Sequence, residues 1–202
     1  MFKSRGSRGF RGSLFAAVLL AATVATLAAA PSQDAPAPTP ARGRRGSPSQ
    51  PQQQQGLDYF IGSWTFSWTG RESPLSSGPR TGSVTYTRAG DGNSADMRAE
   101  GTSDAGGTFK ESGVLRWNAA TKTLAMQETL PNNVQISSSG DWSSPISIIV
   151  ESQPLQVQGQ QVRLKRTYSI LSGTSFRVTD ELSANGGAFS RLGVGDFRKS
   201  QK

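Results

Sequence analysis

Runs of alternating apolar and polar residues fill the chain from about residue 57 to its end. In residues 64–69 every second position is aromatic and the others are serine or threonine, and residues 84–87 alternate valine and tyrosine with threonine. Side chains two positions apart share one face of a β-strand, so this period indicates strands with one buried and one solvated face. The pattern therefore predicts a domain made of short strands.

About ten such runs can be counted, and they are separated by clusters of glycine, proline, asparagine, aspartate and serine. Those residue types favour turns, and no segment shows the 3.6-residue period of a convincing amphipathic helix. The expected strands are residues 64–69, 84–87, 96–101, 109–117, 123–130, 134–138, 146–152, 161–170, 174–183 and 189–197.

The connections between these runs are short, which favours antiparallel neighbours because a parallel pair needs a long crossover. Closing the sheet on itself removes the exposed edges that ten antiparallel strands would otherwise leave. We therefore expect an all-β fold, an antiparallel meander of about ten strands closed into a barrel. An immunoglobulin-like sandwich is the alternative, although it would need Greek-key crossings in place of a meander.

The start of the chain has the pattern of a targeting segment. Four basic residues within the first eleven precede an uncharged run, residues 14–30, that ends in three alanines. Such a pattern is typical of a signal peptide, so we expect residues 1–30 to direct the protein to the periplasm or the exterior by the Sec route. An uncleaved anchor is the alternative. The run is short and rich in alanine for a membrane span, so we expect no stable span after cleavage.

A second segment, residues 31–56, contains six of the eleven prolines, four consecutive glutamines and no large apolar residue. It cannot bury enough surface to offset the entropy of ordering, so we expect a disordered linker. The β-barrel domain is then expected at residues 57–199.

Composition excludes several function classes. The chain has no histidine and no cysteine, which removes disulfides, thiolate nucleophiles, Ser-His-Asp triads and the usual zinc sites, and we expect no metal and no cofactor. The net charge of +8 lies mostly outside the expected barrel: residues 1–56 hold seven basic and one acidic group (+6), and residues 57–202 hold 15 basic and 13 acidic groups (+2). Nucleic-acid binding needs clustered positive charge on the folded domain, so we expect no nucleic-acid partner.

The sequence Tyr-Phe-Ile-Gly-Ser-Trp at residues 59–64 opens the first expected strand. Its Gly62 and Trp64 resemble the Gly-x-Trp start of calycin-like barrels, the group of lipocalins, fatty-acid-binding proteins and nitrobindin-like proteins. The resemblance implies that Arg198, near the last strand, covers Trp64. An ending without a helix looks more like nitrobindin-like barrels or secreted bacterial families of unknown function. Haem binding does not carry over, because the chain has no histidine to ligate iron.

Four of the expected strands place one ionisable group in an otherwise apolar, inward-facing row. These groups are Glu111, Glu128, Arg166 and Asp180, and Tyr86 and Tyr168 add hydroxyls to the interior. Unpaired buried charges are costly, so we expect the four groups to pair with one another or to be hydrated. In one interpretation they orient a ligand. In the other they form a structural ion pair, or β-bulges move some of them outside.

Three function classes follow, and we rank them in this order. The first is an exported barrel that binds a small hydrophobic or amphipathic molecule in a cavity of several hundred Å³. The second is a structural or interaction domain whose barrel is filled and whose outer face pairs with another copy in an oligomer. The third is a cofactor-free isomerase or hydrolase with Glu111 or Glu128 as a base of raised pKa, and Arg166 or Tyr168 stabilising an oxyanion.

Overall fold

The fold was analysed in a computed structural model that describes residues 55–201. The predicted signal peptide and the predicted linker up to residue 54 lie outside the described residues. Within residues 55–201, no helix is long and apolar enough to cross a membrane. The elements are a short 3₁₀ helix η1 (Leu57–Tyr59) and the strands β1 (Gly62–Gly70), β2 (Glu72–Ser73), β3 (Ser76–Ser77), β4 (Arg80–Arg88), β5 (Ser94–Ser103), β6 (Thr108–Asn118), β7 (Thr123–Thr129), β8 (Gln135–Ser144), β9 (Ser147–Ser152), β10 (Leu155–Val157), β11 (Gln160–Ser172), β12 (Ser175–Ala184) and β13 (Ser190–Lys199).

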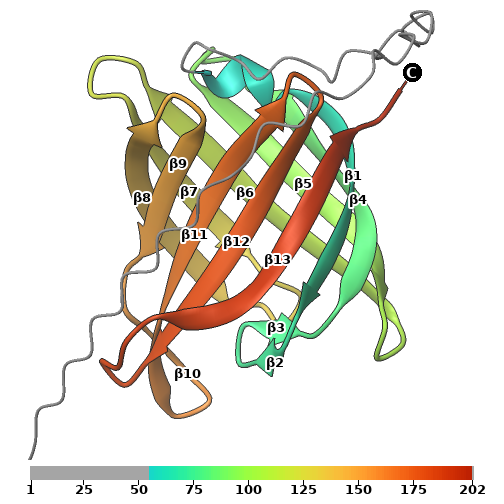
Figure 1. Cartoon of the computed structure of the whole chain (residues 1–202), viewed down its shortest axis with the longest axis vertical. Helices are drawn as coiled ribbons and strands as arrows, with labels where there is room; N and C mark the ends of the chain where they lie inside the picture. The colour runs from blue at the N-terminus through green and yellow to red at the C-terminus, as the bar shows by residue number, and fades with distance from the viewer. Residues whose placement is uncertain (1–54, 202) are drawn as a thin grey trace, which may run out of the picture. The chain divides into compact units, whose positions relative to one another are not determined.

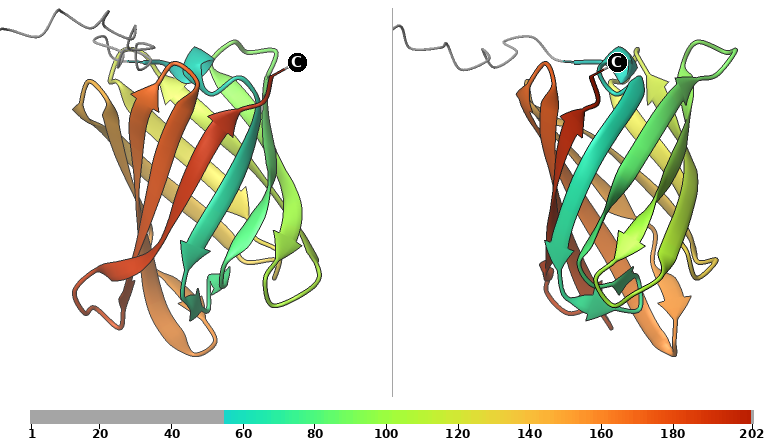
Figure 2. Two further views of the ribbon diagram at one scale, coloured as in Figure 1. Left: turned by 45° about the vertical axis from the view of Figure 1, so that its right-hand side comes forward. Right: turned by 90° about the vertical axis from the view of Figure 1, so that its right-hand side faces the viewer.

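Ten of these strands form one closed antiparallel barrel (Figures 1 and 2). Going round the barrel the order is β1-β4-β5-β6-β7-β8-β9-β11-β12-β13, and β13 pairs back with β1, so the sheet has no free edge along its main strands. Apart from the closing pair of β13 with β1, each pair joins barrel strands that follow one another along the chain, as short connections require. The predicted all-β meander of about ten strands is confirmed, and the sandwich alternative is wrong. Each predicted run matches one barrel strand and extends beyond it by at most one residue.

Four short elements were not predicted. They are η1, the two-residue strands β2 and β3 that pair only with each other, and β10, which pairs with the first residues of β11. Segments of two or three residues are too short to show an alternation of apolar and polar positions, so the pattern could not indicate them.

Burial follows the alternation in the sequence. In β1, Trp64, Phe66 and Trp68 are buried while the serine and threonines between them are exposed. Phe176 of β12 lies at the centre of a group of aromatic rings: its ring centroid is 4.8 Å from that of Trp64 and 4.5 Å from that of Phe197. The lumen is therefore packed with side chains from many strands.

Both ends of the barrel are covered (Figures 1 and 2). At the end where β1 begins, η1 places Tyr59 and Phe60 over the lumen, and the Tyr59 hydroxyl donates to the carbonyl oxygens of Ser172 (2.9 Å) and Ser175 (2.8 Å). At the other end, the β2–β3 hairpin inserts Leu75, which is 7% exposed. We call these the η1 end and the hairpin end.

The Gly-x-Trp sequence lies at the η1 end. Gly62 has a φ of +114°, which only glycine adopts without strain, and Trp64 is fully buried, with its indole Nε1–H donating to the carbonyl oxygen of Phe60 at 2.7 Å. The prediction that Arg198 covers Trp64 is wrong. Arg198 is exposed and lies opposite Thr65, whereas Lys199 lies opposite Trp64 and places its Nζ 5.2 Å from the indole centroid. Successive residues of a strand face opposite sides, so a difference of one residue exchanges their roles.

Candidate interior ligand site

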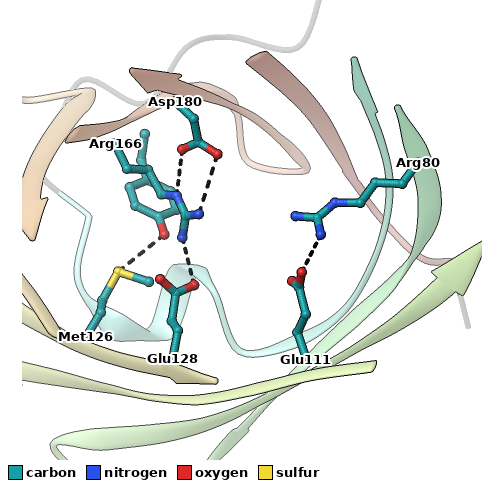
Figure 3. Close-up of polar contacts among 7 residues, drawn as sticks. Arg80, Glu111, Met126, Glu128, Arg166 and Asp180 are labelled. Atoms are coloured by element: carbon teal, nitrogen blue, oxygen red, sulfur yellow. Dashed lines mark hydrogen bonds and ion pairs between the residues drawn. The ribbon is translucent and has the colours of Figure 1, made fainter. Parts of the chain in front are cut away.

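The structure brings all four predicted ionisable residues into the lumen (Figure 3). They come from different strands, β6, β7, β11 and β12, and they line one cavity of about 50 Å³ together with a fifth charged residue, Arg80 of β4. Tyr86 and Tyr168 line the same cavity. The residues that the alternation along the strands predicted to face inward therefore meet at one site. Arg80 is the member of the site that the sequence did not predict.

Arg166 forms ion pairs with two carboxylates. Its Nε donates to Asp180 Oδ1 at 2.8 Å, and its Nη1 donates to Glu128 Oε1 at 2.7 Å (Figure 3). Asp180 faces Arg166 from the neighbouring strand β12, whereas Glu128 belongs to β7, which does not pair with β11, so Arg166 reaches across the lumen. A register shift in the β12–β13 pairing follows Asp180, yet Asp180 stays buried. We call Arg166, Glu128 and Asp180 the Arg166 triad.

The second ion pair joins Arg80 Nη1 to Glu111 Oε1 (Figure 3). Their side chains are 12% and 10% exposed. The Arg80 guanidinium also lies 5.1 Å from the centroid of the Phe109 ring and 5.5 Å from that of Trp68, distances typical of cation–π contacts. The inward row of β4, followed back from Tyr86 through Val84 and position 82, leads to Arg80, and this extension is the signal by which the sequence could have indicated it.

The two tyrosines differ in their contacts. The Tyr168 hydroxyl donates to the sulfur of Met126 at 3.3 Å, while the Tyr86 ring packs at 5.9 Å from the ring of Phe60. Burial raises the pKa of both hydroxyls well above the ordinary value. Both therefore remain neutral at physiological pH, as hydroxyl groups.

Burial and ion pairing shift the pKa values of Glu111 and Arg166 in opposite directions. Burial raises the pKa of Glu111, and the Arg80 guanidinium opposes that rise. For Arg166, burial alone would lower the pKa, but the carboxylates of Asp180 and Glu128 outweigh it, so the pKa of Arg166 is raised well above its ordinary value. Arg166 is therefore charged at neutral pH.

Two N–H donors at the cavity have no acceptor in the described part of the chain. These are the indole Nε1 of Trp68, a residue that is 4% exposed, and Nε of Arg80. Both residues line the 50 Å³ cavity. Trp68 is fixed against strand β13, where a Cβ added to Gly193 would lie 2.2 Å from Cζ2 of the indole. The ring occupies the space that a side chain at position 193 would need.

A series of small spaces leads from the surface to the cavity at the hairpin end. A cleft of about 160 Å³ lies between the β2–β3 hairpin and the β7–β8 turn, where Asn132 Nδ2 donates to the carbonyl oxygen of Pro74 at 3.1 Å. A void of about 10 Å³ beneath Leu75 follows, and then the 50 Å³ cavity. Arg80 lines all three, so its side chain borders both the interior cavity and the surface cleft.

The lumen does not contain the cavity of several hundred Å³ that ligand binding was expected to require. About 50 Å³ accommodates a few water molecules or a group of a few heavy atoms, whereas ligand pockets usually measure about 300–1,000 Å³. A larger hollow, of about 780 Å³, is an open groove that includes outward-facing polar side chains of β4–β7 such as Arg98, Glu100 and Lys110. No group of three side chains suited to hold a metal ion occurs within residues 55–201.

No protein-family model and no curated protein matches the chain. Among solved structures, the barrel is similar to that of Rv2717c from M. tuberculosis, with a TM-score of 0.57 and 17% identity over 72% of this chain and 95% of that one. A redesigned β-barrel, b11L5F_LGL, matches with a TM-score of 0.43 and 13% identity over 73% and 97% of the two chains. The barrel EF1p2_mFAP2b bound to DFHBI matches with a TM-score of 0.42 and 15% identity over 72% and 97%. The likeness to Rv2717c shows a shared β-barrel fold.

Proposed function

We propose that the protein is an exported barrel that binds a small amphipathic molecule, whose polar group enters the lumen at the Arg166 triad and the Arg80–Glu111 pair. The observation that carries the proposal is the convergence of five ionisable side chains, from five strands, on one cavity. Buried ion pairs contribute little to folding, because well-packed apolar residues of the same volume serve stability as well or better. Their presence in an otherwise apolar lumen is therefore better explained by recognition of a polar group.

The size of the cavity limits what can enter it. The polar group has only a few heavy atoms, since about 50 Å³ is available among the charged side chains. The apolar part of such a molecule extends toward the hairpin end, where five aliphatic side chains line the small void beside the charged Arg80, Arg166 and Asp180. The aliphatic residues are Leu75, Leu130, Ile136, Leu164 and Leu192. A longer ligand requires Leu75 and its hairpin to move outward.

A second candidate function, a filled barrel that acts as a structural or interaction domain, is favoured by the same small volume. It predicts that no small molecule stabilises the fold through the lumen. The two functions can therefore be separated by closing the cavity.

Closing the cavity is achieved by Ala99→Ile, because Ala99 is 6% exposed and lines the cavity from β5. Ala125→Ile is the matched control, since Ala125 is exposed on the outer face of β7. We would measure thermal unfolding of the wild-type protein and both variants against a library of molecules of up to about twelve heavy atoms. Binding to the folded state alone stabilises it by about 2.7 kcal/mol when the ligand is at 100 times its Kd.

We expect at least one compound to raise the melting temperature of the wild type and of Ala125→Ile but not of Ala99→Ile. Native mass spectrometry of the same mixtures would then show a single bound molecule. If every compound affects Ala99→Ile as it affects the wild type, the lumen is not a binding site and the filled-barrel function takes its place.

A further inference from the structure

Two residues that line the interior cavity carry a buried N–H donor without an acceptor in residues 55–201. Trp68 Nε1 and Arg80 Nε are both buried, both belong to residues that line the cavity, and neither has an acceptor among the described residues. A buried donor without an acceptor is costly, and most such groups in proteins are paired. Each of the two N–H groups therefore needs a hydrogen-bond acceptor, and the cavity that both residues line is the space available for one.

The charges around this place indicate which kind of acceptor fits. Three carboxylates face two guanidinium groups in the lumen, and each guanidinium already contacts a carboxylate. An additional anion would add negative charge to a cavity in which carboxylates are already in excess, with little water to screen it. A cation would meet two N–H donors and two guanidinium groups. A neutral group that offers lone pairs meets neither penalty.

We propose that the molecule bound in the lumen presents a neutral carbonyl group to Trp68 Nε1 and Arg80 Nε. The inference rests on the proposed function and adds the chemical class of the ligand: a ketone, aldehyde or amide carbonyl rather than a carboxylate or an amine. A carbonyl oxygen has two lone pairs and so has the capacity to accept two hydrogen bonds.

Trp68 is a rigid donor for this purpose. Its indole lies against Gly193 and Gly195 of β13, positions at which a Cβ would come within 2.2 and 3.1 Å of the ring. The Arg80 guanidinium also lies over the ring, 5.5 Å from its centroid. These close contacts leave the indole little room to turn, so Nε1–H is a donor of fixed position.

The test uses the four indole N–H signals of the ¹⁵N-labelled protein and three probes of nearly the same shape. Acetone carries a neutral carbonyl, acetate carries a charge, and isobutene has neither. Trp64 is the internal reference, because its Nε1 already donates to the carbonyl oxygen of Phe60. Trp68→Phe removes the donor and keeps an aromatic ring, and Trp142→Phe is its matched control, because Trp142 Nε1 also lacks an acceptor but Trp142 does not line the cavity.

We expect acetone to shift the Trp68 indole signal downfield in a saturable manner, to leave the Trp64 signal in place, and to bind at least tenfold more tightly than acetate or isobutene. Trp68→Phe should weaken acetone binding about fivefold, the usual effect of losing one hydrogen bond, and Trp142→Phe should leave it unchanged. The wild-type titration decides the matter even if Trp68→Phe does not fold.

Two results would overturn the carbonyl assignment. Tighter binding of acetate or isobutene than of acetone would show that the site selects another chemistry. An unresponsive Trp68 signal with all three probes would show that only water pairs the two donors. Neither result removes the proposed function, which fails only if Ala99→Ile responds to every compound of the library as the wild type does.

Discussion

Replacement of Arg166 by methionine tests whether the charges in the lumen are desolvated. In the wild type Arg166 contacts Glu128 at 2.7 Å and Asp180 at 2.8 Å, and the three side chains are only 13%, 7% and 6% exposed. Arg166→Met keeps an unbranched chain and leaves two buried carboxylates without their partner. Removing one member of a buried ion pair costs about 3–5 kcal/mol, and we expect a loss in that range at pH 7. A domain of this size has a total stability of about 5–15 kcal/mol, so the change is readily measured.

The assay is urea unfolding followed by tryptophan fluorescence, with Arg163→Met as the matched control. Arg163 lies three residues earlier in β11 and pairs with Glu151 at 2.5 Å, but its side chain is 44% exposed, so we expect its loss to cost at most about 1 kcal/mol. A loss below about 1 kcal/mol for Arg166→Met as well would refute the reasoning, because it would mean that water reaches the Arg166 triad.

Two other substitutions probe the Arg80 side of the cavity. Glu111→Gln tests the raised pKa of Glu111. Because of burial, the folded state holds the Glu111 proton more tightly than the unfolded chain, in which the pKa is near 4.5. The stability that this proton contributes is therefore complete below pH 4.5 and is lost as the pH rises through the pKa of the folded state. Glutamine does not titrate, so in urea unfolding from pH 4 to 8 the free energy of unfolding of Glu111→Gln should rise relative to that of the wild type as the pH increases. If it falls relative to the wild type instead, burial is not the main influence on the Glu111 pKa. Gly193→Ala places a Cβ within 2.2 Å of the Trp68 ring, and we expect a loss of about 1–3 kcal/mol in urea unfolding. Gly90→Ala, with no atom within 4 Å of the added Cβ, should cost far less, and equal costs would show that the ring moves freely.

Alternation in the sequence was sufficient to predict the barrel strands and the inward position of Glu111, Glu128, Arg166 and Asp180. Parity depends only on the local chain, and each of these residues lies in a run with apolar neighbours on both sides. Arg80 was missed because the inward row of β4 before Val84 contains only glycine and arginine, so the pattern there has no apolar residue to follow.

Other features depend on more than the local chain. Whether Arg198 or Lys199 covers Trp64 is set by the register between the first and last strands, which the sequence does not contain. The cavity volume depends on how side chains from all the strands fill the lumen, and the closure of the hairpin end depends on Leu75, which belongs to a segment too short to show a pattern. The fold class follows from the period of apolar and polar residues in the sequence, whereas the shape of the site depends on how side chains from different strands pack in the lumen.

One end of the lumen carries charged side chains and the other carries aromatic and aliphatic ones, and this difference favours ligand entry at the charged end. Along β12 the inward row runs from Asp180 through Val178 to Phe176, and along β11 it runs from Arg166 through Tyr168 to Ile170, in each case from charged to apolar. At the η1 end the aromatic rings pack against one another and the Tyr59 hydroxyl is held by two carbonyl groups.

The charged side chains, by contrast, lie toward the hairpin end, where the cover is thinner. The hairpin strands pair only with each other, and the side-chain hydrogen bond that ties the hairpin to the β7–β8 turn is the one from Asn132 to Pro74. Segments with few hydrogen bonds to the rest of a structure open most easily. A molecule that enters beneath Leu75 reaches Arg80, Trp68 and the Arg166 and Asp180 side chains together, because all four line the small void there. The proposed carbonyl contacts therefore lie on the entrance side of the lumen.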